Sequence, residues 1–136
     1  MSLEIEKYSW DQYQTDIVSL SQWIKASGRE FECIVGLARG GLIPAVQLSH
    51  ELNLPLITLT YQTRDGTMKD SKPIPANALI VDDINDTGKT LSEVTKLCEG
   101  KYTTVVLYDN DESEFNVDFW MRKNYNRWIS FPWEKV

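Results

Sequence analysis

Two adjacent carboxylates and the polar loop behind them are the residues of this chain best suited to chemistry. Asp82 and Asp83 directly follow the apolar run Ala78-Leu79-Ile80-Val81, which is typical of a buried strand in a parallel sheet. The loop Asp86-Thr87-Gly88-Lys89-Thr90 comes next. Carboxylates accept hydrogen bonds from vicinal hydroxyls and bind magnesium, which prefers oxygen ligands. The stretch therefore favours a ligand that carries sugar hydroxyls.

The residues after the loop predict a helix, because apolar side chains recur at helical spacing from Leu91 to Cys98. Free backbone N–H groups and the helix dipole attract a phosphate to such a helix start. Gly88 would let the backbone approach the phosphate closely, and Thr87 and Thr90 could add hydroxyl donors. A strand, a polar loop and a helix start together favour a site for a phosphorylated sugar.

Two other interpretations of this loop need consideration. Gly88-Lys89-Thr90 has the form of the end of a nucleotide-triphosphate P-loop, but that motif needs a glycine where this chain has Asp83. A carboxylate there would repel the phosphate, so we reject the P-loop. The second alternative is a solvated acidic loop before an ordinary helix that Asp86 caps.

A second loop with glycines follows an earlier predicted strand, Phe31 to Gly36. The loop reads Gly36-Leu37-Ala38-Arg39-Gly40-Gly41, and Pro44 fixes the start of the next helix near Gly41 or Leu42. Glycines and an arginine ahead of a helix form a second candidate anion site. The alternative is that Arg39 is a surface arginine at a strand end.

The stretch Ala78–Leu91 closely resembles the phosphoribosyl-pyrophosphate signature of type I phosphoribosyltransferases: an apolar strand, two acidic residues and Asp-Thr-Gly-x-Thr. The run Ala38–Leu52 is similar to xanthine-guanine and hypoxanthine-guanine phosphoribosyltransferases, and the tail Arg127–Glu134 resembles the end of 6-oxopurine enzymes. The resemblance spans Ser9 to Glu134. It implies an α/β fold with a doubly wound, mainly parallel sheet and flanking helices, which we expect to form one domain over residues 1–136.

The resemblance implies that ribose 5-phosphate passes from phosphoribosyl pyrophosphate to a nucleobase, which we expect to be a purine. Asp86 would lie beside the incoming base, where a carboxylate can take a ring proton. Asp83 would bind magnesium. The residues implied to hold the phosphoribosyl group are Asp82, Asp83, Asp86, Thr87, Gly88, Lys89 and Thr90.

The same resemblance assigns the pyrophosphate to Ala38, Arg39 and Gly40, and it implies a cis peptide bond between Ala38 and Arg39. Residues 61–76 are polar and contain glycine and proline, so we expect a flexible loop, which in the family forms a hood over the reaction centre. Arg64 on this loop is a further candidate for pyrophosphate binding.

For the base, the resemblance points to Trp128 as a stacking partner, with Ile129 next to it. Asp109 stands where 6-oxopurine enzymes usually carry a lysine that donates to the base carbonyl. A carboxylate accepts where a lysine donates. The base therefore offers an N–H at that edge, or another group serves the carbonyl, or the protein binds ligands without catalysis. The last case is our alternative function, a regulatory protein that binds phosphoribosyl pyrophosphate or a nucleotide.

The length of 136 residues suits one domain, and the net charge of −6 argues against broad nucleic-acid binding. No apolar run predicts a membrane span, and the acidic N-terminal residues predict no signal peptide. Cys33 and Cys98 are not paired in a Cys-x-x-Cys motif, so we expect buried thiols in the cytoplasm. The resemblance implies a homodimer or homotetramer.

The other elements follow from periodicity and end signals. Ser9 and Gln12 form a capping box ahead of a helix to Ser27. Strands are predicted over 54–60 and 102–108, with an edge strand over 116–122. His50 is expected on the solvent side of its helix, and Trp133 in the core.

Overall fold

The computed structural model describes residues 4–60 and 72–135 of the chain. Its helices are α1 (Trp10–Ala26), α2 (Leu42–Leu52) and α3 (Lys89–Thr95). Its strands are β1 (Ile5–Lys7), β2 (Cys33–Ala38), β3 (Leu56–Thr60), β4 (Ala78–Asn85), β5 (Tyr102–Asn110), β6 (Arg122–Asn124) and β7 (Trp128–Ser130).

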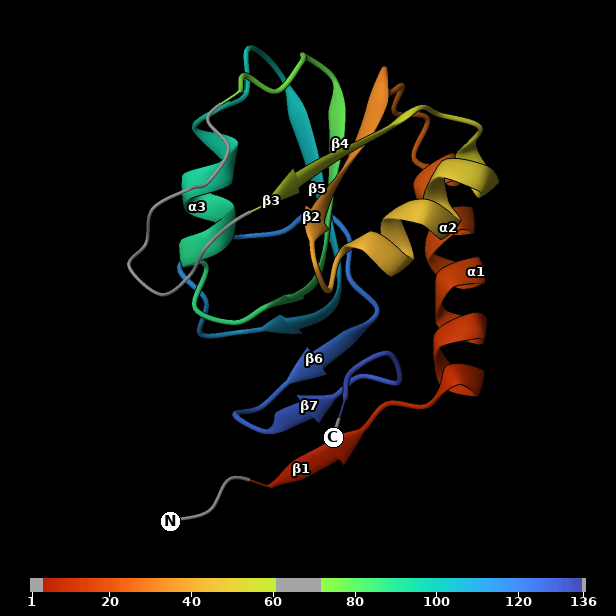
Figure 1. Ribbon diagram of the computed structural model, residues 1–136, viewed down its shortest axis with the longest axis vertical. Helices are drawn as coiled ribbons and strands as arrows, with labels where there is room; N and C mark the ends of the chain where they lie inside the picture. Colours follow the sequence, from red (N-terminus) through yellow and green to blue (C-terminus); the bar gives the residue numbers. More distant parts are fainter. Residues whose placement is uncertain (1–3, 61–71, 136) are drawn as a thin grey trace.

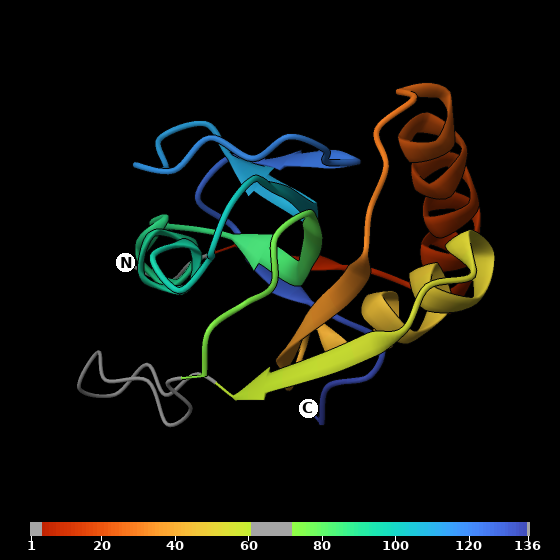
Figure 2. The ribbon, with the colours of Figure 1, turned by 90° about the horizontal axis from the view of Figure 1, so that it is seen from above.

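Five strands form the central sheet in the order β3-β2-β4-β5-β6, and each neighbouring pair is parallel. Helices α1 and α2 cover one face and α3 covers the other (Figures 1 and 2). The chain runs outward from β2 to β3 and then returns to build β4, β5 and β6 on the opposite side of β2. The doubly wound, parallel α/β fold predicted from the sequence is confirmed.

The central strands are buried on both faces, as their continuous apolar runs predict. Because side chains alternate along a strand, Ile34 packs in the core beneath α1 and α2 while Val35 packs in the core beneath α3. The same division places Leu79 in the first core and Ile80 in the second. The sheet is therefore held between two separate apolar layers.

Helix α1 has the start that the sequence predicts. The Gln12 amide donates to Ser9 Oγ (3.1 Å), and the Ser9 amide donates to Gln12 Oε1 (2.9 Å), which completes the capping box. The buried side chains Ile17, Leu20 and Ile24 recur at helical spacing on the face toward the sheet. Outside the cores, His50 is exposed as predicted.

Strands β4 and β5 extend further than their apolar runs. β4 continues through both aspartates to Asn85, and β5 continues to Asn110. The parallel pairing persists because Asn85 lies opposite Asp109, and the Asn85 Nδ2 donates to Asp109 Oδ1 (2.8 Å). A polar side-chain pair therefore replaces apolar packing at this end of the sheet.

The predicted edge strand over 116–122 is wrong. This segment lies beside β5 with one isolated bridge, between Val105 and Phe119, and the Val106 amide donates to the Phe119 carbonyl (3.1 Å). The Asp118 carboxylate accepts from the Thr104 amide (2.9 Å), and the pairing does not become a regular ladder before Arg122. The edge strand is β6, which begins at Arg122. The predicted helix after Gly88 is also shorter than expected, since it ends at Thr95, before Cys98.

The short strands β1 and β7 pair with each other in a second, parallel sheet, which the sequence did not predict. They lie beyond the carboxyl ends of the central strands (Figure 1). Buried Asp16 on α1 ties this layer to the fold, because Oδ2 accepts from the Tyr8 hydroxyl (2.7 Å) and from Arg122 Nε (2.7 Å). One carboxylate thus connects α1, the end of β1 and the start of β6.

We expect Asp16→Ala to lower the free energy of unfolding by about 2 kcal/mol, because it leaves the buried Tyr8 hydroxyl without its acceptor and Arg122 without its partner. Urea unfolding followed by circular dichroism measures the change. The matched control is Asp11→Ala in the exposed first turn of the same helix, which should cost less than about 1 kcal/mol. Equal losses in the two variants would contradict the anchoring role of Asp16.

Candidate functional site

A cleft of about 270 Å³ opens at the carboxyl ends of β2 and β4. These neighbouring strands are followed by helices on opposite faces of the sheet, so their loops diverge and leave a crevice, which is where doubly wound folds bind ligands. The lining residues come from the two loops singled out in the sequence: Leu37, Ala38, Gly40, Asp82, Asp83, Ile84, Asn85, Asp86, Thr87, Gly88, Thr90 and Leu91.

The loop after β2 packs closely against the two aspartates. A Cβ atom at Gly40 would overlap the carboxylate of Asp83, so a larger residue there would displace that carboxylate. The peptide bond between Ala38 and Arg39 is cis, as the resemblance implies. Arg39 itself is exposed beside the cleft and is absent from its lining.

Asp82 and Asp83 are partly buried and lie in consecutive positions of β4, next to the cleft. The Asp83 amide donates to Asp82 Oδ1 (2.9 Å), and the Ile84 amide donates to Asp83 Oδ1 (2.9 Å). Burial and the neighbouring Asp83 carboxylate raise the pKa of Asp82, and burial also raises the pKa of Asp83. The pair suits a ligand that brings hydroxyl donors or a cation.

Gly88 adopts a φ of +92°, and a Cβ there would lie 2.6 Å from the backbone nitrogen of Phe115. The glycine is thus required by the approach of loop 113–115, whose Glu114 amide donates to the Thr87 carbonyl (2.9 Å). The Thr87 hydroxyl accepts from the Lys89 amide (3.2 Å). Lys89 is exposed and does not line the cleft.

Asp86 is exposed at the mouth of the cleft, and Asn110 at the end of β5 donates to its Oδ1 (3.1 Å). The next residue inward, Asn85, is buried and donates both to Asp109 and to the Phe115 carbonyl (2.8 Å each). These bonds fix the loop on either side of Asp86. Sequence reasoning missed both asparagines, and their only signal was a position within acidic stretches at strand ends.

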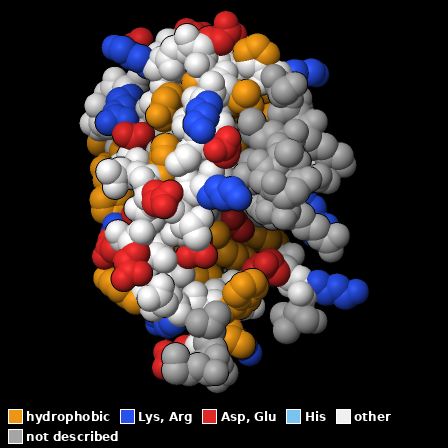
Figure 3. Space-filling view, turned by 90° about the vertical axis from the view of Figure 1, so that its left-hand side faces the viewer, with side chains coloured by type: hydrophobic (Ala, Val, Ile, Leu, Met, Phe, Trp, Pro, Cys, Tyr) orange, Lys and Arg blue, Asp and Glu red, His pale blue; other side chains and the backbone are white. Residues whose placement is uncertain are grey.

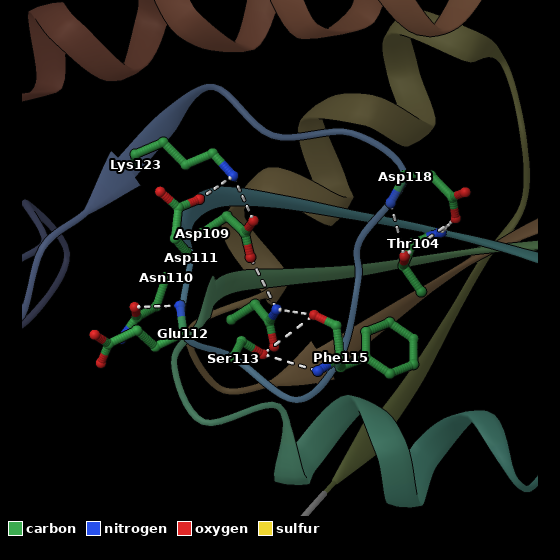
Figure 4. Close-up of polar contacts among 10 residues, drawn as sticks. Thr104, Asp109, Asn110, Asp111, Glu112, Ser113, Phe115, Asp118 and Lys123 are labelled. Carbon is green, nitrogen blue, oxygen red and sulfur yellow. Dashed lines mark hydrogen bonds and ion pairs between the residues drawn. The ribbon is translucent and has the colours of Figure 1, made fainter.

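Asp109 also lies at this end of the sheet, but it is buried and already engaged. It accepts from Asn85 and forms an ion pair with Lys123 on β6 (2.9 Å), and Lys123 also pairs with Asp111 (2.9 Å; Figure 4). The backbone brings Asp109 and Lys123 together, because they lie opposite each other in the parallel pairing of β5 with β6.

The remaining predicted site residues are spread around this end of the molecule. Trp128 on β7 is exposed, whereas the adjacent Ile129 is buried in the core beneath α1. Neither contributes to the lining of the cleft between the loops. Arg64 and most of the predicted hood loop lie outside the described residues. Trp133 packs against the core residue Phe131, as predicted (5.1 Å between ring centroids).

A larger hollow of about 1200 Å³ lies at the opposite edge of the sheet, near the amino ends of the strands. Arg29, one of its cationic residues, is already paired with Asp118 (3.2 Å). Open α/β sheets bind their ligands at the carboxyl edge. The cleft between the two loops is therefore the better candidate, although it is smaller.

Figure 3 shows the face covered by α3, where single Lys and Arg side chains alternate with Asp and Glu among the residues described. No helix in the described ranges is both long and apolar enough to cross a membrane.

Comparison with known proteins matches residues 9–135 to the family described as "Phosphoribosyl transferase domain". A xanthine-guanine phosphoribosyltransferase from Chromohalobacter salexigens is 35% identical, over 93% of this chain and 82% of that protein. The corresponding protein from Gluconobacter oxydans is 32% identical, with the same coverage.

Solved structures give the same result. The purine phosphoribosyltransferase of Pyrococcus horikoshii superposes with a TM-score of 0.84 and 30% identity, covering 98% of this chain and 97% of that one. The xanthine-guanine-hypoxanthine phosphoribosyltransferase of Helicobacter pylori has a TM-score of 0.78 at 22% identity, covering 96% and 92%, which supports the fold alone.

The raised pKa of Asp82 predicts that Asp82→Asn stabilises the protein. An acid with a higher pKa in the folded state costs stability as pH rises from its unfolded pKa toward its folded pKa. We expect the gain to be present at pH 7 and to disappear below about pH 4, where the carboxyl group is protonated in both states. Asparagine can still accept the Asp83 amide.

Thermal and urea unfolding between pH 3 and pH 8 measure this effect, with exposed Asp11→Asn as the control. A gain that does not depend on pH would show that desolvation of the carboxylate is not its cause.

Proposed function

The chain belongs to the phosphoribosyl transferase domain family, and from this premise we propose that it is a purine phosphoribosyltransferase. It would transfer ribose 5-phosphate from phosphoribosyl pyrophosphate to a purine and release pyrophosphate. The observation that carries the proposal is that the loops after β2 and β4 meet in one cleft. One loop suits pyrophosphate and the other suits phosphorylated ribose.

In this proposal the loop from Asp86 to Thr90 holds the 5′-phosphate with backbone N–H groups and the Thr87 and Thr90 hydroxyls. α3 has only seven residues, so the loop donors matter more than the helix dipole. Asp82 and Asp83 would accept hydrogen bonds from the ribose hydroxyls. Because Gly40 lies against Asp83, a pyrophosphate on the first loop would lie beside the ribose.

The donor set at Asp82 and Asp83 also fits magnesium. Mg²⁺ typically uses one or two carboxylates and completes its shell with water and substrate phosphates. Bound there by Asp83, the ion would neutralise charge on the pyrophosphate.

The reaction breaks the bond between the ribose anomeric carbon and the pyrophosphate oxygen and forms a bond to a ring nitrogen of the purine. Arg39, exposed beside the cleft, would stabilise the charge on the leaving pyrophosphate, and Arg64 is proposed to assist. Asp86 would take the proton that the ring nitrogen loses. The Asn110 amide holds one oxygen of Asp86, which leaves the other for this proton.

The purine would lie between Asp86 and the β1–β7 layer, which is located beyond the carboxyl ends of the central strands (Figure 1). Trp128 is 59% exposed on β7 and offers a flat surface for stacking. Stacking of this kind contributes about 1–3 kcal/mol to binding of a base. The buried Ile129 would contribute through its backbone.

The proposed setting is the cytoplasm, and the proposed assembly is a homodimer or homotetramer. Exposed apolar side chains on α1 and α2, including Trp10, Val18 and Val46, line a surface groove and support an oligomer.

The test incubates the protein with phosphoribosyl pyrophosphate, magnesium and each common nucleobase, and detects the nucleotide by mass. We expect product with guanine, hypoxanthine or xanthine. Product from no base, together with binding of phosphoribosyl pyrophosphate, would favour the alternative of a non-catalytic binding protein.

Asp86→Asn should lower kcat by at least about 100-fold while preserving nucleotide affinity, because it removes the proton acceptor and keeps the bond from Asn110. Steady-state kinetics and calorimetry measure the two quantities. Asp11→Asn is the matched control. An unchanged kcat would remove Asp86 as the general base.

A further inference from the structure

The loop 110–115, which starts at the end of β5, folds back against the loop that follows β4. Side chains attach both of its ends there. The Asn110 amide donates to Asp86 Oδ1 (3.1 Å), and the Phe115 carbonyl accepts from Asn85 Nδ2 (2.8 Å). Asn85 and Asp86 line the cleft, whereas none of the residues described over 110–115 does. The loop 110–115 therefore packs behind one wall of the cleft.

The middle of the loop 110–115 contacts the backbone of residues 87 and 88 directly. The Glu114 amide donates to the Thr87 carbonyl (2.9 Å). An added Cβ atom at Gly88 would lie 2.6 Å from both Ser113 Oγ and the Phe115 nitrogen. A side chain at position 88 would therefore push the two loops apart.

This contact sets the direction of a backbone donor in the cleft. The peptide bond between Thr87 and Gly88 is trans, and the carbonyl and the N–H of a trans peptide point in opposite directions. Because the Thr87 carbonyl faces Glu114, the Gly88 N–H points away from the loop 110–115. Gly88 lines the cleft, and its N–H is one of the donors that we propose for the 5′-phosphate.

The shape of the loop 110–115 depends on one hydroxyl group. Ser113 Oγ donates to the Phe115 carbonyl (3.1 Å) and accepts from the Phe115 amide (3.1 Å; Figure 4). The Asn110 side chain closes the other half of the loop, because its Oδ1 accepts from the Glu112 amide (3.0 Å). Ser113 thus holds both backbone groups of the residue whose carbonyl binds Asn85.

We propose that Ser113 is a positioning residue for the phosphate-binding loop. Its hydroxyl holds the loop 110–115 in the shape that fits against Thr87 and Gly88, and the fit orients the backbone donors of residues 86–90. This inference rests on the proposed function for the ligand of residues 86–90. Ser113 itself touches no ligand in this arrangement and acts through Phe115 and Gly88.

The contacts predict that the effect is local. Glu112 and Glu114 are exposed, and Phe115 is the residue of this loop that packs, partly buried, against the core beneath α3. The first loop of the cleft, after β2, makes its close approach at Gly40, which lies against Asp83. Loss of the Ser113 hydroxyl should therefore disturb the site for the phosphorylated ribose and spare the site for pyrophosphate.

The experiment measures binding of ribose 5-phosphate and of inorganic pyrophosphate by calorimetry. Ser113→Ala should weaken ribose 5-phosphate by about 3- to 10-fold, the size of one ordinary hydrogen bond, and leave pyrophosphate unchanged. Ser113→Thr keeps the hydroxyl and should restore the affinity. Ser49→Ala on α2 is the matched control, since Ser49 is also half-buried and its hydroxyl donates to a backbone carbonyl (2.6 Å).

Hydrogen exchange followed by mass spectrometry provides a second readout that needs no ligand. The amides of residues 86–90 should exchange faster in Ser113→Ala than in the unmodified protein, Ser113→Thr or Ser49→Ala. Circular dichroism verifies that each variant is folded. Equal weakening of both ligands by Ser113→Ala would indicate a merely structural serine and would overturn the proposal.

The proposal would also be overturned by unchanged exchange of residues 86–90 in Ser113→Ala, or by a ribose 5-phosphate affinity that this variant does not alter. These readouts are independent of turnover. A protein that makes no nucleotide but shows faster exchange and weaker ribose 5-phosphate binding in Ser113→Ala would refute the proposed function and preserve the role of Ser113. Nucleotide synthesis with unchanged exchange in that variant would do the reverse.

Discussion

The hydrogen bond between Asn85 and Asp109 is the contact on which the carboxyl edge of the sheet depends. It joins the last pair of β4 and β5 after the apolar packing has ended. The same asparagine holds the Phe115 carbonyl, and the same aspartate holds Lys123. Because a buried polar group needs its partner, this pair fixes two strands, a loop and a cation relative to each other. Asp86 follows Asn85 directly in the chain, so the same contacts restrain the backbone of Asp86.

The cleft concentrates carboxylates in a way that opposes folding. Asp82 and Asp83 are consecutive and partly buried, and burial raises both pKa values, so the folded protein loses stability by keeping them charged. By contrast, the buried carboxylate of Asp16, which connects α1 to β6, has the guanidinium of Arg122 as a partner of opposite charge. The two aspartates with raised pKa values thus lie where a ligand can supply hydroxyl donors or a cation, as is common at functional sites.

The sequence was sufficient where the signal is local and periodic. The capping box and the spacing of Ile17, Leu20 and Ile24 predicted α1, and the apolar run from Ala78 predicted the centre of β4. It was insufficient where tertiary contacts decide. The polar end of β4 depends on Asp109 in another strand, and β1 and β7, with three residues each, are defined only by their mutual pairing. At 116–122, the Asp118 carboxylate takes the Thr104 amide, and the segment has one isolated bridge to β5 instead of the regular strand that the pattern suggested.

The same limit explains why Asp109 is misleading when it is considered alone. In the sequence, Asp109 places a negative charge where an oxopurine site is expected to carry the positive charge of a lysine. In the structure its charge is balanced by Lys123, fourteen residues later along the chain, which parallel pairing of β5 with β6 places opposite it. Lys123 also pairs with Asp111, so the three side chains together carry a formal charge of −1. A base bound at this end of the sheet would therefore face an ammonium flanked by two carboxylates. The charge of Asp109 alone does not determine which group of the base the site accepts.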